Sequence, residues 1–456
     1  MRRIFLISFL LVILASLANA ADMYAFRVYL KDKGDSGFSI SRPEAFLSDR
    51  TIEKRQKTEI PITYSDLPIS SEYLQSFSRI GAYPVVWSKW LQTVVVESND
   101  SSIICRLRKI SFVDSVKWVW SGDYERTQKN IFLTRKDRLS PDGKRLKNYY
   151  GYAEKQIRML HVDNLHKAGY QGQGMRIAVL DAGFQNVNRI NAFNSINLIG
   201  TYNVIAPTAS VFDGDEHGTK ALSCLAANLP GFMVGTAPKA SYLLIRCENS
   251  DSEYPIEEDY WTRAAEYADS VGVDVISSSL GYFSFDADEL SYQKSDLDGQ
   301  TAQISKAAHI ASEKGILVFC SAGNEGDSDW KKITFPGDAK GVVTVGSVDE
   351  NKKHSSFSSV GYTADRRIKP DVVAMGTNSC IVNFEGRILE ASGTSFATPI
   401  LAGAVTCLWQ ALQRLNSKDI IRLICRYSSN AAKPNNEIGF GIPNLNKALK
   451  NGRSIH

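Results

Sequence analysis

The stretch 174-GMRIAVLDAGF-184 is an apolar, β-branched segment that stops at an acidic residue. Residues 176–180 have the pattern of a strand that is buried on both faces of a sheet. Asp181 follows directly, and the small residues Ala182 and Gly183 come next. A carboxylate in this place could grip a nucleotide ribose, hold a metal, orient a histidine or end a turn. The other segments of the 456-residue chain decide between these roles.

The C-terminal two thirds of the chain repeat this kind of buried segment. Apolar strand-like runs alternate with amphipathic helix-like runs, which predicts an α/β fold: a mostly parallel sheet with helices on both faces, spanning residues 152–456. Functional residues of such sheets gather at the carboxyl ends of the strands. The predicted strands are 176–180, 241–246, 273–278, 316–320 and 342–348, and the predicted helices are 218–227, 260–271, 301–314 and 394–415.

The N-terminus indicates export. Residues 1–20 combine a positive start, an apolar run and the small-x-small sequence Ala18-Asn19-Ala20, which is typical of a signal peptide cut after Ala20. The apolar run is shorter than the ~20 residues that span a bilayer. We therefore expect a secreted or periplasmic protein with no membrane span after cleavage. The net charge of +4 gives no argument for a nucleic-acid partner.

A small α+β domain is predicted over residues 21–120. Strand-like runs at 24–30, 90–97 and 113–120 alternate with helical runs at about 41–57, 71–80 and 101–110, the first of them opened by a capping box at Ser41-Arg-Pro-Glu44. Residues 121–151 are polar and basic, with the runs RTQKN and TRKDRLSPDGKRLKN. They predict a solvated linker that a protease can reach, and we expect the processing site there.

A nucleotide role for Asp181 is disfavoured by its context, and so is a metal site in the acidic run around His217. Gly172 and Gly174 form a GxG, but they precede the strand, whereas a dinucleotide fingerprint places its glycines after it. His217 lies in the acidic run DGDEHGT, with no second histidine or cysteine at ligand spacing. The orienting role and the turn role remain open.

Two further polar motifs lie next to segments that are predicted to be buried. Ser395 lies in GTSFATP at the start of a long apolar helix, where it could be a helix cap or a nucleophile beside a base. Asn324 lies in SAGNEG after a buried strand, where it could form a turn or donate to an oxyanion.

Together these motifs resemble the subtilisin-like serine peptidases (subtilases). They are IAVLDAG around Asp181, HGT at His217, SSSLG at 277–281, SAGNEG around Asn324 and GTSFATP around Ser395. The resemblance implies that Ser395 is the nucleophile, that His217 is its base, that Asp181 orients the histidine, and that Asn324 donates to the oxyanion.

The resemblance also implies the substrate site and the partners. Ser279, Leu280 and Gly281 would pair with an extended polypeptide substrate, and Ala322 and Gly323 would help to wall the pocket for the residue before the scissile bond, which we expect to be apolar or medium-sized. The 21–120 domain would be a propeptide and intramolecular inhibitor, and the whole chain a secreted serine endopeptidase made as a zymogen. The chemistry would need no cofactor or metal, and any structural calcium site cannot be placed.

Ala182 stands where the family commonly has Ser or Thr, and a catalytically silent binding or scaffolding module is the alternative to an enzyme. An esterase or transferase is a third reading, disfavoured because Ser395 does not lie in a GxSxG elbow. Cysteines Cys224, Cys320 and Cys407 are expected to be buried, and a Cys247–Cys380 disulfide is conceivable.

Overall fold

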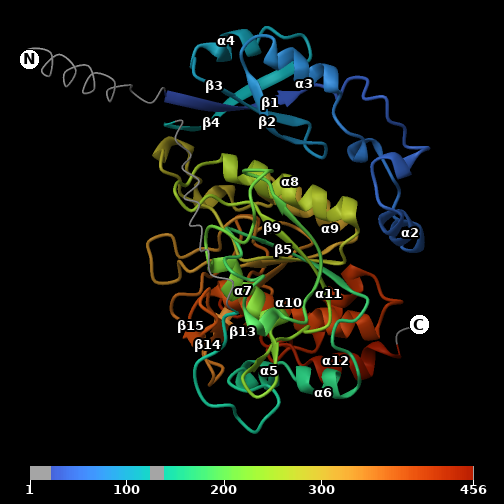
Figure 1. Cartoon of the computed structure of the whole chain (residues 1–456), viewed down its shortest axis with the longest axis vertical. Helices are drawn as coiled ribbons and strands as arrows, with labels where there is room; N and C mark the ends of the chain where they lie inside the picture. Colours follow the sequence, from blue (N-terminus) through green and yellow to red (C-terminus); the bar gives the residue numbers. More distant parts are fainter. Residues whose placement is uncertain (1–21, 124–137, 455–456) are drawn as a thin grey trace, which may run out of the picture.

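A computed structural model describes residues 22–123 and 138–454 of the chain. The predicted signal peptide (1–20) and residues 124–137 of the predicted linker lie outside the described residues. A small N-terminal α+β domain lies against a larger α/β domain (Figure 1). The fold class predicted from the sequence is confirmed.

The small domain is an antiparallel sheet with two helices, Ser71–Ser78 and Ile103–Leu107, packed on one face. Its strand order is β2-β3-β1-β4. Along β1, Phe26 and Val28 face a core shared with the domain's own helices, whereas Ala25 packs in the core of the larger domain. Because successive side chains of a strand point to opposite faces, one face of this sheet packs against the small domain's own helices and the other against the larger domain. The elements are β1 (Asp22–Leu30), α2 (Asp49–Lys57), α3 (Ser71–Ser78), β2 (Tyr83–Ser88), β3 (Thr93–Ser98), α4 (Ile103–Leu107) and β4 (Val113–Asp123).

The larger domain is built on a seven-stranded parallel sheet of order β13-β12-β11-β10-β5-β9-β6. Two short hairpins, β7–β8 and β14–β15, lie outside it. The strands are β5 (Arg176–Asp181), β6 (Asn197–Asn203), β7 (Asn228–Leu229), β8 (Met233–Val234), β9 (Ser241–Arg246), β10 (Val275–Ser278), β11 (Leu317–Ser321), β12 (Val343–Val348), β13 (Val372–Met375), β14 (Ser379–Val382) and β15 (Ile388–Ala391).

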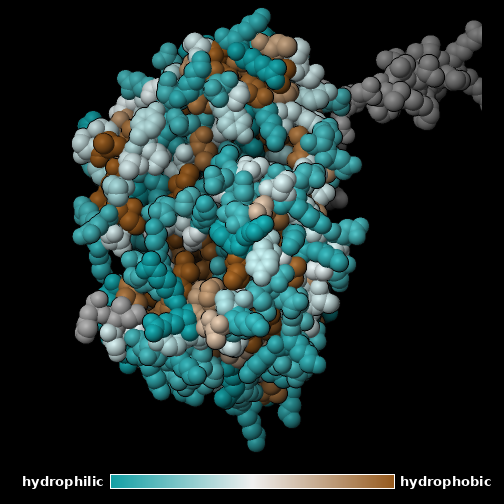
Figure 2. Space-filling model, turned by 180° about the vertical axis from the view of Figure 1, so that it is seen from behind, coloured by the Kyte–Doolittle hydropathy of each residue, from teal (hydrophilic) through white to brown (hydrophobic). Residues whose placement is uncertain are grey.

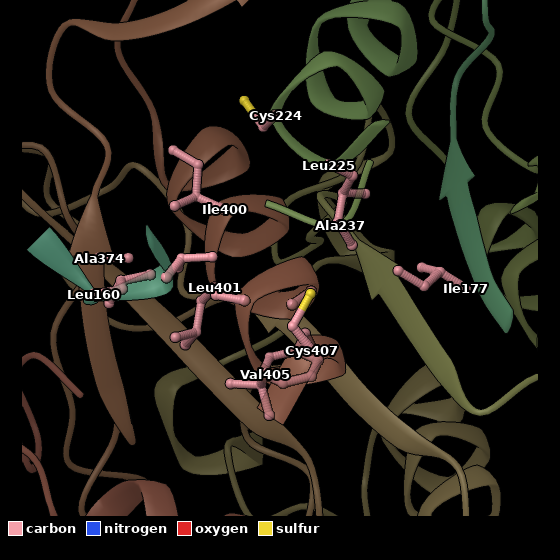
Figure 3. Packing of buried hydrophobic residues seen from close by; sticks show 14 of the residues in the cluster. Leu160, Ile177, Cys224, Leu225, Ala237, Ala374, Ile400, Leu401, Val405 and Cys407 are labelled. Atoms are coloured by element: carbon pink, nitrogen blue, oxygen red, sulfur yellow. The ribbon is translucent and has the colours of Figure 1, made fainter. Parts of the chain in front are cut away.

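Helices cover both faces of this sheet. Ile177 and Val179 of β5 pack in one core, which Figure 3 shows around the central helix α10, and Ala178 and Leu180 pack in another beneath α8 and α9. A continuous apolar run therefore serves two cores at once. The helices are α5 (Glu154–Met159), α6 (Val162–Lys167), α7 (His217–Ala226), α8 (Ile256–Val271), α9 (Gln303–Glu313), α10 (Thr394–Ala411), α11 (Ser417–Arg426) and α12 (Leu445–Gly452).

Some local predictions were wrong. Residues 41–57 form a short 3-10 turn (Pro43–Ala45) and then α2, whose N-cap is Ser48, with its hydroxyl accepting from Thr51 N. Proline in the first turn favoured the earlier start, but the backbone leaves the helical region at Phe46, where φ is −144°, so the 3-10 turn does not run on into α2. Strands β2, β6 and β13 were missed: β2 contains Pro84, β6 carries polar residues and a glycine, and β13 has only four residues.

The cysteines behave as small apolar residues. Cys224, Cys320 and Cys407 are fully buried as expected, and all seven cysteines are free. The conceivable Cys247–Cys380 disulfide is not formed: Cys247 packs in the core beneath α8 and α9, whereas Cys380 packs in the other core, where Cys224 Sγ lies 3.9 Å from the Cys380 carbonyl oxygen. Burial raises the pKa of the Cys224 and Cys247 thiols.

The surface carries a mixture of residue types. Figure 2 shows one face that is mostly hydrophilic, with hydrophobic residues in small groups. Among the described residues, no helix has both the length and the apolar character needed to cross a bilayer.

Candidate active site

The predicted site residues come from five elements that meet at one edge of the sheet. Strands β5, β10 and β11 are neighbours and parallel, so their carboxyl ends lie together. Asp181 ends β5, and residues 279–281 follow β10. Asn324 comes three residues after β11, while His217 and Ser395 lie in the first turns of α7 and α10.

The aspartate and histidine form a direct contact. His217 Nδ1 lies 2.7 Å from Asp181 Oδ1, and the aspartate is fully buried whereas the histidine side chain is 32% exposed. The negative charge of Asp181 raises the pKa of His217 to about 9, against the opposing effect of burial. An aspartate on Nδ1 leaves Nε2 as the ring atom available to take a proton.

A glycine brings the two residues together. A Cβ atom at Gly218 would lie 2.3 Å from the carbonyl oxygen of Gly183 and 2.9 Å from Asp181 Cβ. Only glycine therefore lets the start of α7 approach the end of β5 this closely. The same turn is held by Asp215, whose Oδ1 accepts from His217 N at 2.6 Å.

The second carboxylate oxygen of Asp181 has no partner among the described residues. Ala182 N donates to Oδ1 at 2.9 Å, the oxygen that also contacts His217, whereas Oδ2 is buried without a hydrogen bond. Ala182 has no hydroxyl to offer it. The departure at position 182 therefore leaves the Asp181–His217 contact in place and coincides with an unsatisfied oxygen behind it.

Ser395 is buried at the start of α10 and does not cap it. The N-cap is Gly393, with no side-chain cap, so the capping alternative for Ser395 is excluded. Ser395 Oγ donates to the Ser279 carbonyl at 3.2 Å, and Ser279 Oγ donates to the Ser395 carbonyl at 2.8 Å. This reciprocal pair joins the helix start to the segment after β10.

Asn324 is held in one orientation by the residue before the serine. Its Oδ1 accepts from Thr394 N at 2.9 Å and from Thr394 Oγ1 at 3.0 Å. The Nδ2 group is therefore turned away from Thr394 and is available as a donor. Gly323 beside it has φ of +99°, and a Cβ there would lie 2.7 Å from Thr334 Cγ2. Glycine at 323 lets the loop turn towards the site.

These residues line one cavity of about 210 Å³. Asp181 and Ala322, which are fully buried, do not line it: Asp181 stands behind His217, and the Ala322 backbone is bonded to Val345 and Thr334. The lining residues are His217, Glu248, Glu253, Ser279, Leu280, Gly281, Tyr282, Phe283, Ser321, Gly323, Asn324, Glu325, Thr334, Thr394 and Ser395.

No local sequence pattern pointed to the three glutamates of this lining, Glu248, Glu253 and Glu325. Burial, followed by the charge of Asp181, raises the pKa of Glu248 to about 7. Burial, followed by the charge of Glu248, raises the pKa of Glu253 to about 8. Glu248 lies two residues after β9, and β9 is the neighbour of β5, which ends at Asp181. Knowledge of the strand order would therefore have placed Glu248 near the site.

The described residues contain no group of three or more His, Cys, Asp or Glu side chains that could hold a metal ion. The acidic run around Asp215 is used internally instead: Asp215 Oδ1 accepts from His217 N, and Asp215 Oδ2 accepts from Ser250 Oγ at 3.1 Å. The structure therefore places no calcium site among the described residues.

The small domain lies against α8 (Figure 1), and buried ionic contacts hold it there. Arg27 of β1 donates to both oxygens of Asp259 at 2.6–2.9 Å, and it is 1% exposed. Arg55 of α2 donates to Asp269 at 2.6 Å. Both ion pairs are buried, so removing one residue of a pair would leave the charge of its partner buried and unpaired.

A second contact joins the turn after β2 to α8. The buried carboxylate of Glu266 accepts from Ser88 Oγ at 2.6 Å, from Trp90 N at 2.9 Å and from Lys89 N at 3.2 Å. One side chain of the larger domain thus satisfies two backbone N–H groups of the smaller one. The contact is specific to the pairing of these two domains. Helix α8 also precedes β10, and the residues that follow β10, 279–281, line the cavity.

A buried aspartate on a histidine, beside a serine at a helix start, is the arrangement of hydrolases that act through an activated serine. Comparison with known proteins gives the family. Residues 172–441 match the model of the subtilase family (Peptidase S8), and residues 25–132 match the Peptidase S8 propeptide domain of Bacteroidota. The chain belongs to the subtilase family: it is a serine endopeptidase made as a zymogen.

Individual relatives agree with this assignment. The chain is 27% identical to subtilisin DY of Bacillus licheniformis over 288 residues, which cover 62% of this chain and 93% of that one. It is 30% identical to the major intracellular serine protease of Bacillus subtilis (strain 168) over 262 residues, which cover 55% and 73%.

Among solved structures, MycP1 from the ESX-1 type VII secretion system is similar in fold. The TM-score is 0.54 and the identity 20%, over 69% of this chain and 90% of that one.

Proposed function

We propose that this chain is an exported endopeptidase that cleaves polypeptides through Asp181, His217 and Ser395. The observation that carries the proposal is the 2.7 Å contact of His217 with the buried Asp181, made at the cavity that Ser395 also lines. His217 Nε2 takes the Ser395 proton as Oγ attacks the carbonyl carbon, and the imidazolium then gives that proton to the leaving amine. Water, activated in the same way, releases the acyl group.

The oxyanion of each tetrahedral intermediate needs donors that are fixed in advance. Asn324 supports this role because Thr394 binds its oxygen and leaves Nδ2 to donate. The N-terminus of α10 adds a favourable positive potential at Ser395. Both devices act where negative charge develops and require no movement at the moment of reaction.

Substrate binding itself would release the nucleophile. Ser395 Oγ is engaged with the Ser279 carbonyl in the described structure. A substrate strand that pairs with residues 279–281 competes for that carbonyl through its own N–H group. The hydroxyl is then free to turn to His217, which ties the activation of the serine to occupation of the cavity.

The small domain is proposed to act as the intramolecular inhibitor until it is cut off within residues 121–151. Its buried contacts with α8 support this, because α8 leads into the strand beside the cavity. Export to a secreted or periplasmic place is proposed from the signal-like residues 1–20. Both parts are checked by locating the mature protein and sequencing its N-terminus, which should lie at or after residue 121.

The main test compares the precursor with its Ser395→Ala variant. We expect the first to shorten and to hydrolyse casein, and the second to stay full length and inert. Equal processing and equal hydrolysis in both would defeat the proposal. No processing and no hydrolysis in either would favour a catalytically silent member of the family.

A further inference from the structure

The wall of the cavity beside His217 is acidic. Glu248 and Glu253 both line it, and the described structure forms no ion pair between either of them and a lysine or arginine. Glu248 Oε2 accepts from the Tyr282 hydroxyl at 3.2 Å, and the Glu253 side chain has no described hydrogen bond. The cavity contains no lysine or arginine among its lining residues.

These carboxylates are half-buried and repel one another. The groups that face Glu248 are Asp181, His217, Asp215 and Tyr282, and those that face Glu253 are Glu248 and Asp286. Only His217 among them is able to carry a positive charge. Ionising both desolvated carboxyl groups without a cation is costly, which is why the pKa values of Glu248 and Glu253 are raised; an incoming cation would favour the ionised pair and relieve both the desolvation and the repulsion.

We propose that this wall selects a lysine or arginine side chain of the substrate at P2, the residue before the one whose carbonyl is attacked. The inference rests on the proposed function, because it assumes a substrate strand along residues 279–281. Side chains of an extended strand alternate between two sides. If P1 points to the wall formed by Ser321 and Gly323, then P2 points to the side of His217 and Glu248.

The chain's own predicted processing segment has matching chemistry. The sequence between Asp123 and Ser140 carries the runs RTQKN and TRKDR, with a basic residue every few positions. A protease that prefers a basic P2 residue would find several sites in such a segment. The expectation of an apolar P1 residue is unaffected, because it concerns the other wall.

The test measures kcat/KM for two fluorogenic peptides that differ only in Lys or Leu at P2, with the wild type and with Glu248→Gln, Glu253→Gln and the double variant. We expect the wild type to prefer Lys by about tenfold, equivalent to about 1.4 kcal/mol. The Lys/Leu ratio should fall in each single variant and approach one in the double variant. Because the Lys/Leu ratio of kcat/KM is taken within one enzyme variant, any change in the reactivity of His217 affects both peptides equally and cancels.

Glu289→Gln is the matched control, because it removes the same charge from an exposed residue that does not line the cavity. It should keep the wild-type ratio. A wild-type enzyme that cleaves both peptides equally, or prefers Leu, would overturn the inference even if a variant failed to fold. A ratio that survives in the double variant would overturn it too. Cleavage of neither peptide, with casein also intact, would instead count against the proposed function.

Discussion

The contact between Glu266 and the turn at residues 88–90 gives a sharp prediction about inhibition by the propeptide. One buried carboxylate accepts three hydrogen bonds, at 2.6, 2.9 and 3.2 Å, from the small domain. Glu266→Gln keeps the size of the side chain, but it removes the charge and places an NH₂ group against N–H donors. Some of the three donors then remain buried without an acceptor.

The size of the effect follows from the cost of breaking a buried, charge-assisted contact across an interface. Truncating one partner of such a set costs about 2–5 kcal/mol. Because each 1.4 kcal/mol is a factor of ten, the propeptide should bind roughly 30-fold to a few thousand-fold more weakly. The lower end applies if the glutamine oxygen keeps one of the backbone N–H bonds.

The assay uses mature enzyme prepared by maturation of each full-length variant. Purified residues 22–123, which have a sheet and core of their own, are then added and the inhibition constant is measured. Glu313→Gln is the control, since that exposed residue pairs with Lys418 instead and makes no described contact with the small domain. An inhibition constant for Glu266→Gln within threefold of both wild type and control would refute the reasoning.

Three further variants probe the cavity. Asn324→Ala should lower kcat by about 10²–10³ with little change in KM, a magnitude taken from the same kind of donor in subtilisin, and an unchanged kcat would exclude the oxyanion role. Glu248→Gln removes a negative charge that raises the pKa of His217. Because the neutral imidazole is the base, the acid limb of the pH profile of kcat/KM should move to lower pH. A shift of that limb to higher pH would contradict this. Ala182→Ser offers a hydroxyl to the unpartnered Oδ2 of Asp181 and should raise the free energy of unfolding by about 1 kcal/mol, measured by denaturant titration of inactivated protein; a loss of stability would show that the oxygen is not within reach.

Residues with a strong local pattern were predicted well. The strands around Asp181 and Cys320 are apolar runs with clear ends, and β9 begins and ends as predicted at Ser241 and Arg246. The motifs that hold Asp181, His217, Asn324 and Ser395 are contiguous, so each could be placed after a strand or at a helix start from its own neighbours.

Features that depend on strand order could not be predicted in this way. Glu248 becomes a cavity residue only because β9 lies beside β5, and no local pattern encodes that neighbour. Ala322 was placed in the pocket by its motif, but its backbone is tied into the sheet and its side chain is buried. Arg27 looks like an ordinary polar residue of an alternating strand, and its burial against Asp259 exists only when the two domains meet.

The central claim is that Ser395 is the nucleophile and that His217 activates it. The most direct measurement is covalent labelling of the mature enzyme with a fluorophosphonate, followed by mass spectrometry of its peptides. We predict a single labelled site, Ser395, with labelling abolished in Ser395→Ala and strongly slowed in His217→Ala. Label on another residue, or equal rates of labelling with and without the histidine, would contradict the account.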